Sequence, residues 1–251
     1  MMKRFSYLIY VLLFIGFAAM MSCSNKKGTN KEKESDEPVV SEKVPAVCMY
    51  DYSVYGLPVL EDYTNSKSNL TNIKLGEVAT YLGETVTDSV SKKEYCKIEL
   101  SDGTTGWTTC KYLAINATPA AVITATPVYE RPDILTKSAK KAYESIDIVA
   151  ITEEKDGWCN VVGRNNLNSG WVLKENLSVN NDDFAMAIIA RKEIFDSKGN
   201  IMDDKLNDFI NNAQFPGSKI IALLRDRLIQ NVESSAASEP EQEAGPEDLP
   251  E

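Results

Sequence analysis

The chain has 251 residues, with 27 Lys and Arg, 37 Asp and Glu, and no histidine. Its net charge of −10 opposes binding to nucleic acid and to anionic head groups. The lack of histidine excludes a Ser–His–Asp triad, a Cys–His pair and histidine-ligated zinc. Hydrolysis by paired carboxylates stays open, although Glu153-Glu154 and Asp203-Asp204 are adjacent residues whose side chains point apart. We therefore expect a protein with no catalytic residue, no metal and no cofactor.

Residues 1–22 are typical of an export signal. Lys3 and Arg4 precede an apolar run over residues 5–21, which is short for a membrane span of roughly 20 apolar residues. The segment Met-Met-Ser-Cys that ends at Cys23 resembles the lipobox of bacterial lipoproteins, which implies cleavage before Cys23 and lipidation of its thiol. The alternative is an ordinary signal peptide cut near Ala18 or Ser22. Removing residues 1–22 takes away Lys3 and Arg4, so the net charge falls from −10 to −12.

Two flanking segments are predicted to be disordered. Residues 23–43 are rich in Lys, Glu, Ser and Asn, and residues 233–251 are mostly Glu, Pro, Ala and Ser. Neither segment can bury enough apolar area to offset the entropy of ordering its backbone. Behind a lipidated Cys23 the first segment would act as an extended tether.

The remaining body contains an internal repeat. One copy carries Tyr-Cys-Lys-Ile at residues 95–98, a Ser-Asp-Gly turn, Gly-Trp at 106–107 and Leu113. The other carries Trp-Cys-Asn-Val at 158–161, a polar turn, Gly-Trp at 170–171 and Leu177. The spacing from Trp to Leu is the same in both copies. Alternating apolar and polar residues around short turns predict β strands, so the repeat indicates two small β domains in tandem.

These motifs resemble the bacterial SH3-like (SH3b) domain, over residues 46–115 and 121–179. The family's early Asn-Val-Arg and Gly-Pro motifs are replaced by Leu57-Pro58-Val59 in the first copy. The second copy has Pro127-Val128 there, followed by an insertion from Glu130 to Tyr143. The resemblance implies a binding module of the cell envelope that engages peptidoglycan peptides or short protein segments.

The expected fold is therefore mainly β, with two small SH3-like barrels in tandem at residues 44–116 and 117–180. A short helical region follows at 181–232, because apolar residues recur there at helical spacing. Asp182 or Asp183 could cap the first helix, residues 197–200 break the pattern, and Pro216 could open a third helix. We expect a small bundle docked on the second barrel, with a partner-binding surface as the alternative.

Four cysteines follow Cys23. Cys96 and Cys159 occupy the same position in the repeat, on the strand face shared with apolar residues, so we expect both in the cores. In an SH3-like barrel the terminal strands run close together, which makes a Cys48–Cys110 disulfide a candidate in an exported protein. No Cys-x-x-Cys spacing points to a metal site.

Aromatic residues give a candidate ligand groove, because SH3-type grooves often hold extended peptides on aromatic side chains. The candidates are Tyr50, Tyr52, Tyr55, Trp107 and Trp171. Tyr50 and Tyr52 would share one strand face. The alternative is that the tyrosines cap the core or line an edge strand, and that both tryptophans are core or rim residues.

The resulting hypothesis is a membrane-anchored envelope lipoprotein whose SH3-like modules bind peptidoglycan or peptide ligands. It would be held to a bacterial membrane by lipid on Cys23, with no nucleic-acid partner. One alternative is a surface-exposed lipoprotein that binds host or neighbouring-cell proteins. A carboxylate-based hydrolase is the third reading.

Overall fold

The computed structural model describes residues 43–196 and 198–236. The expected signal peptide, the lipidation site at Cys23 and almost all of the expected tether lie outside the described residues, as does the acidic tail beyond residue 236.

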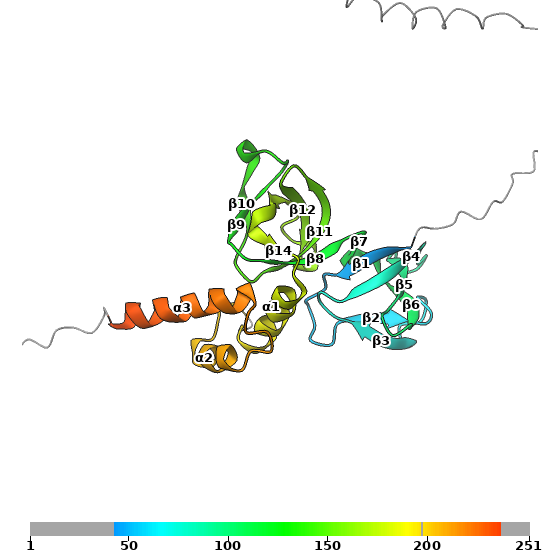
Figure 1. Ribbon diagram of the computed structural model, residues 1–251. Helices are drawn as coiled ribbons and strands as arrows, with labels where there is room; N and C mark the ends of the chain where they lie inside the picture. The colour runs from blue at the N-terminus through cyan, green and yellow to red at the C-terminus, as the bar shows by residue number, and fades with distance from the viewer. Residues whose placement is uncertain (1–42, 197, 237–251) are drawn as a thin grey trace, which may run out of the picture. The chain divides into compact units, whose positions relative to one another are not determined.

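The first repeat forms a seven-stranded antiparallel sheet (Figure 1). Its strand order is β3-β2-β6-β5-β4-β1-β7, and a short 3-10 helix, η1 (Cys110–Tyr112), joins the last two strands in the sequence. The strands are β1 (Val44–Cys48), β2 (Leu57–Leu60), β3 (Asn69–Ile73), β4 (Val78–Thr87), β5 (Glu94–Glu99), β6 (Thr105–Thr109) and β7 (Leu113–Ile115).

The second repeat forms another seven-stranded sheet, with the equivalent order β10-β9-β13-β12-β11-β8-β14. Three 3-10 helices occur in it, η2 (Ile134–Thr136), η3 (Arg164–Asn166) and η4 (Lys174–Asn176). The strands are β8 (Thr118–Val122), β9 (Thr126–Tyr129), β10 (Lys137–Tyr143), β11 (Ile148–Lys155), β12 (Trp158–Gly163), β13 (Gly170–Leu173) and β14 (Leu177–Ser178). The mainly β fold with two tandem sheet domains and a helical segment is thus confirmed.

The prediction that residues 130–143 are an insertion in the second repeat is wrong. This segment forms η2 and β10, and β10 pairs with β9 as β3 pairs with β2 in the first repeat. Polar and charged residues fill most of β10 because it is an edge strand whose side chains face solvent. The strand therefore lacks the apolar alternation by which a sequence pattern is recognised.

The Gly-Trp motif has the same structural role in both repeats. Trp107 lies opposite Leu60 on β2, and Trp171 lies opposite Tyr129 on β9. A Cβ atom built on Gly106 would lie 2.7 Å from Val59 Cγ1 and 2.8 Å from the Leu60 carbonyl oxygen. The corresponding distances at Gly170, to Val128 Cγ1 and the Tyr129 carbonyl oxygen, are 2.5 and 2.8 Å. Glycine is thus required because the neighbouring strand passes too close for a side chain.

Three helices follow the second sheet, α1 (Asn181–Glu193), α2 (Asp203–Asn211) and α3 (Lys219–Ala236). The N-cap of α1 is Asn180 rather than Asp182 or Asp183. Its side chain accepts the amide hydrogens of residues 182 and 183. Asp183 is instead buried and accepts the Lys219 backbone N–H at 2.6 Å. The third helix starts at Lys219 rather than at Pro216, and it continues to Ala236, into the segment expected to be disordered.

The helices share an apolar core with both repeats, which we call the shared core. α1 contacts β8 and β11, and its Phe184 and Ile188 side chains lie against Gly76 of the first repeat. We expected the helices to dock on the second repeat, but they pack against both repeats. The buried members of the shared core include Val47, Met49 and Ala114 from the first repeat, Ala121, Ile148 and Ala150 from the second, and Met186, Ala187, Leu206, Phe209, Ile221 and Leu224 from the helical region.

A cluster of four charges joins the repeats to α1 beside the shared core. Arg164 Nη1 lies 2.7 Å from Asp51 Oδ2, and Arg191 Nε lies 3.4 Å from the same oxygen. Asp147 faces both arginines at 3.5 and 3.9 Å. Burial, followed by the nearby Arg164 charge, lowers the pKa of Arg191 from its ordinary value. The backbone N–H of Asn165 also donates to the Met49 carbonyl oxygen at 2.6 Å, so η3 is hydrogen-bonded directly to the first repeat.

The candidate Cys48–Cys110 disulfide is wrong, because Cys110 is bonded to Cys96. Cys96 on β5 lies opposite Thr108 on β6, and Cys110 follows two residues later, at the start of η1. The Cα atoms of Cys96 and Cys110 are 5.1 Å apart. Cys48 lies opposite Leu113 instead and remains a buried thiol. Burial raises the pKa of the Cys48 thiol to about 12. Cys96 and Cys159 are both buried, as expected.

Replacing Gly106 by alanine should destabilise the first repeat by about 1–3 kcal/mol, because the new methyl group would overlap Val59 and the Leu60 carbonyl. Chemical unfolding followed by tryptophan fluorescence measures the change. Gly217→Ala is the matched control, since a Cβ there meets no atom within 4 Å. Equal stability of the two variants would contradict the close strand approach.

The two repeats also predict where a second disulfide can be introduced. Lys174 opens η4 as Cys110 opens η1, and Cys159 takes the position of Cys96. Lys174→Cys should therefore form a disulfide with Cys159, whereas Glu175→Cys, one residue later, should not. Peptide mapping without reduction identifies the bond. Absence of a link between residues 174 and 159 would show that the two η segments are not equivalent.

Candidate ligand-binding surfaces

An aromatic surface lies on the outer face of the first sheet. Cys96 and Ile98 of β5 point into the core, so Tyr95 and Lys97 point outward. Trp107 lies directly opposite Lys97, whose Nζ is 5.6 Å from the centre of the indole ring. Tyr63, from the β2–β3 turn, packs against both outward aromatics, with ring centres 5.8 Å from Tyr95 and 5.3 Å from Trp107. We call Tyr63, Tyr95 and Trp107 the outer aromatic patch.

The second repeat presents aromatics at the equivalent outer positions. Trp158 takes the place of Tyr95 on β12, and Trp171 takes the place of Trp107 on β13. Trp158 packs edge-on against Tyr129, with ring centres 4.9 Å apart. Both tryptophans are half-buried. Each repeat therefore keeps large rings outside its core, where part of their surface is available to a ligand.

A separate cluster of tyrosines lies beyond the end of β1. Tyr50 contacts Tyr112 at 5.0 Å and Tyr52 at 5.7 Å between ring centres. Tyr52 is 63% exposed and Tyr55 is 76% exposed. The Lys111 ammonium lies 5.1 Å from the centre of the Tyr112 ring. Tyr50 and Tyr112 pack against the core of the first repeat, whereas Tyr52 and Tyr55 extend into solvent.

The predicted groove residues therefore lie in three places. Tyr50 and Tyr52 do contact each other, although both follow β1 rather than belonging to it. Trp107 belongs to the outer aromatic patch, and Trp171 lies in the other repeat. Sequence reasoning missed Tyr63, Tyr95, Tyr112 and Trp158 as surface residues. For Tyr95 and Trp158 the signal was present, because each precedes an inward-facing cysteine and must face outward.

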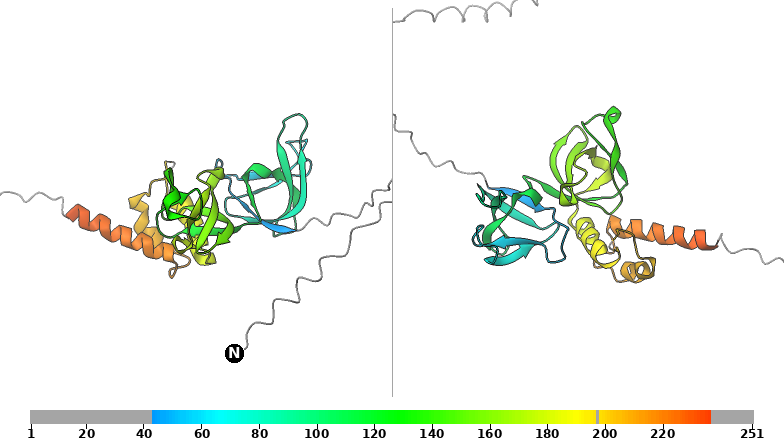
Figure 2. Two further views of the ribbon diagram at one scale, coloured as in Figure 1. Left: turned by 90° about the horizontal axis from the view of Figure 1, so that it is seen from above. Right: turned by 180° about the vertical axis from the view of Figure 1, so that it is seen from behind.

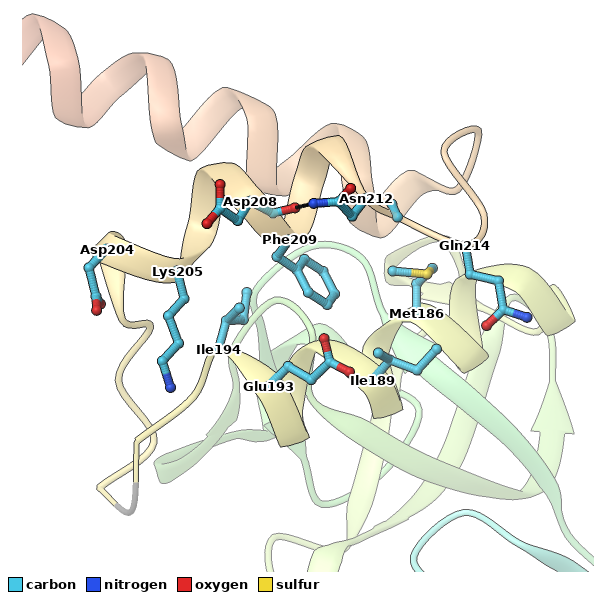
Figure 3. Close-up of a pocket in the computed structure, with 11 residues that line it drawn as sticks. Met186, Ile189, Glu193, Ile194, Asp204, Lys205, Asp208, Phe209, Asn212 and Gln214 are labelled. Atoms are coloured by element: carbon cyan, nitrogen blue, oxygen red, sulfur yellow. Dashed lines mark hydrogen bonds between the residues drawn. The ribbon is translucent and has the colours of Figure 1, made fainter.

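A cleft of about 750 Å³ lies between α1 and α2 (Figure 3). Its apolar floor is formed by Met186 and Ile189 of α1, by Ile194 directly after that helix, and by Phe209 of α2. The remaining lining is mostly polar and includes Glu193, Asp204, Lys205, Asp208, Asn212 and Gln214. Most of the floor is already buried in the shared core, so this cleft offers little uncovered apolar area. Three carboxylates against one ammonium would favour a cationic ligand.

Within residues 43–196 and 198–236, no group of three or more Cys, Asp or Glu side chains is arranged to hold a metal ion. No helix of this described part is long and apolar enough to cross a membrane.

The sequence matches no protein-family model and no curated protein. Among solved structures, NlpC1 and NlpC2 from Trichomonas vaginalis align with it at 12% and 13% identity over 68% and 62% of this chain. The TM-score is 0.25 for both. This chain spans only 60% and 58% of the length of those two structures. Likenesses of this size carry no argument about fold or activity.

Proposed function

We propose that this chain is a membrane-anchored envelope lipoprotein whose two β repeats are SH3-like modules that bind peptidoglycan or peptide ligands. The observation that carries the binding role is the pair of outward tryptophans, Trp107 and Trp171, at equivalent positions of the two sheets. A half-exposed tryptophan leaves ring surface available to a ligand, and aromatic residues are enriched where proteins bind partners.

The chemistry of the outer aromatic patch suits a ligand with both apolar and polar groups. Tyr63, Tyr95 and Trp107 offer ring faces and edges, and the Lys97 ammonium beside them can bind a carboxylate. Lys97 is already paired with Glu84 at 2.8 Å, and both side chains are partly exposed. This ion pair is weak enough for a ligand carboxylate to replace Glu84. Stem peptides of peptidoglycan carry such carboxylates next to short apolar side chains.

The first test is binding of the mature chain, residues 23–251 with Cys23→Ser, to insoluble peptidoglycan. Trp107→Ala should weaken binding at least about tenfold, because a central aromatic residue contributes a large share of the affinity. Trp171→Ala should weaken it too if both repeats engage the ligand. Co-sedimentation at increasing protein concentration measures both effects.

Ile229→Ala is the matched control, since Ile229 is a large exposed residue on α3, outside both sheets. Thermal unfolding of each variant separates loss of binding from loss of fold. Binding that survives the loss of both tryptophans would exclude the outer aromatic surfaces as the site. No sedimentation of the parent chain would direct the search to protein partners.

The anchor is tested by intact-mass analysis of protein extracted from membranes. The expected mass is that of Cys23–Glu251 with added acyl groups, less two hydrogens for the Cys96–Cys110 disulfide. Several acyl chains are expected because a single chain holds only weakly. A mass without lipid, in protein recovered from the soluble fraction, would refute anchoring at Cys23.

A further inference from the structure

The turn between β9 and β10 holds two large aliphatic side chains in solvent. Ile134 is 68% exposed and Leu135 is 88% exposed, and they are adjacent residues of η2. This turn is the green curl at the end of the hairpin labelled β9 and β10 in Figure 1, and it projects from the second repeat in Figure 2 as well.

The turn that exposes Ile134 and Leu135 is held by several hydrogen bonds. The Asp133 carboxylate accepts the Leu135 backbone N–H at 2.9 Å. The Thr136 hydroxyl lies 2.8 Å from the Asp133 carbonyl oxygen and 3.0 Å from that of Arg131. The Glu130 N–H donates to the Thr136 carbonyl oxygen at 3.0 Å and closes the loop. These bonds fix the backbone of the turn while its apolar side chains bury little area against the protein.

The turn and the start of β10, residues 130–141, are basic, whereas the whole chain is acidic. Arg131 and three lysines at positions 137, 140 and 141 outnumber the two carboxylates of Glu130 and Asp133, so residues 130–141 carry a net charge of +2. Lysines on an edge strand are common because they prevent pairing with other sheets. That role does not account for Ile134 and Leu135, which lie beyond the strand.

We propose that this turn is a membrane-contacting tip. Ile134 and Leu135 enter the interface of a bilayer, and the side chains of Arg131, Lys137 and Lys140 lie among anionic head groups. Exposed aliphatic residues flanked by cations are the arrangement by which interfacial segments bind such surfaces. Two aliphatic residues with neighbouring cations give weak and reversible binding to such a surface. The tip goes beyond the proposed function and needs neither the lipid on Cys23 nor the outer aromatic patch.

Co-sedimentation with lipid vesicles tests this inference. The chain is residues 23–251 with Cys23→Ser, which retains every described residue and has no acyl group. The vesicles are phosphatidylcholine, with or without phosphatidylglycerol. The parent chain should partition onto the anionic vesicles, and the double variant Ile134→Ser/Leu135→Ser should lose about tenfold or more of that partitioning. Lys137→Gln/Lys140→Gln should lose several-fold on anionic vesicles, and added salt should reduce the binding of the parent chain.

Val90→Ser is the matched control. Val90 is 88% exposed at the β4–β5 turn of the first repeat and also lies near two lysines, but it has no aliphatic neighbour. Its replacement should leave partitioning unchanged, and all variants should unfold at the parent temperature because the altered side chains are exposed. The proposal is overturned if the parent chain stays in solution with both vesicles, or if the Ile134/Leu135 variant binds as well as the parent. Equal binding to both vesicle types would overturn the role of the cations.

Discussion

The arrangement of the described body depends on one apolar contact, the packing of α1 against both repeats. Phe184 and Ile188 of this helix lie where a side chain at position 76 would project, at 2.7 and 2.8 Å from a Cβ built there. Gly76 keeps that space open and adopts a φ of +77°, which glycine tolerates. The equivalent residue of the second repeat, Ile146, has a φ of +76° and fills the shared core with its own side chain. The two turns thus share one backbone geometry. In the first repeat Gly76 leaves room for α1, and in the second repeat the Ile146 side chain fills the shared core.

Parts of β1 and β11 are buried on both faces, which explains why their sequences lack the alternation of apolar and polar residues. Val47 of β1 faces the shared core, whereas Cys48 faces the core of the first repeat. On β11, Ile148 and Ala150 face the shared core while Val149 faces the core of the second repeat. The stretches 46–49 and 148–151 are continuously apolar, as expected for segments covered on both faces. The four-charge cluster of Asp51, Asp147, Arg164 and Arg191 lies beside this core, where each charge has an opposite neighbour.

The sequence predicted the strands and the two sheet domains, which depend on local patterns. It predicted less well the contacts that depend on which residues of paired strands lie opposite each other. Alternation around Cys96 and Cys159, and the repeated Gly-Trp motif, were enough to predict two sheet domains. The partner of Cys110 depends on which residues of β5 and β6 lie opposite each other, and that is set by the length of the turn between them. The candidate groove residues lie on separate segments for a similar reason, because no local pattern encodes how close Tyr50 and Trp107 lie in space. The cap at Asn180 was missed because the neighbouring aspartates are equally good capping residues.

The two repeats have diverged where their cores do not restrain them. Inward positions keep the same residue types, such as Cys96 and Cys159, because a close-packed interior tolerates little change in volume. Turns and short 3-10 helices differ between the repeats, so Cys110 corresponds to Lys174, and the β2–β3 turn with Tyr63 corresponds to the aliphatic η2 turn. Whole-chain charge averages over such differences. A chain of net charge −10 therefore carries a segment of net charge +2, residues 130–141, on one repeat and the outer aromatic patch on the other.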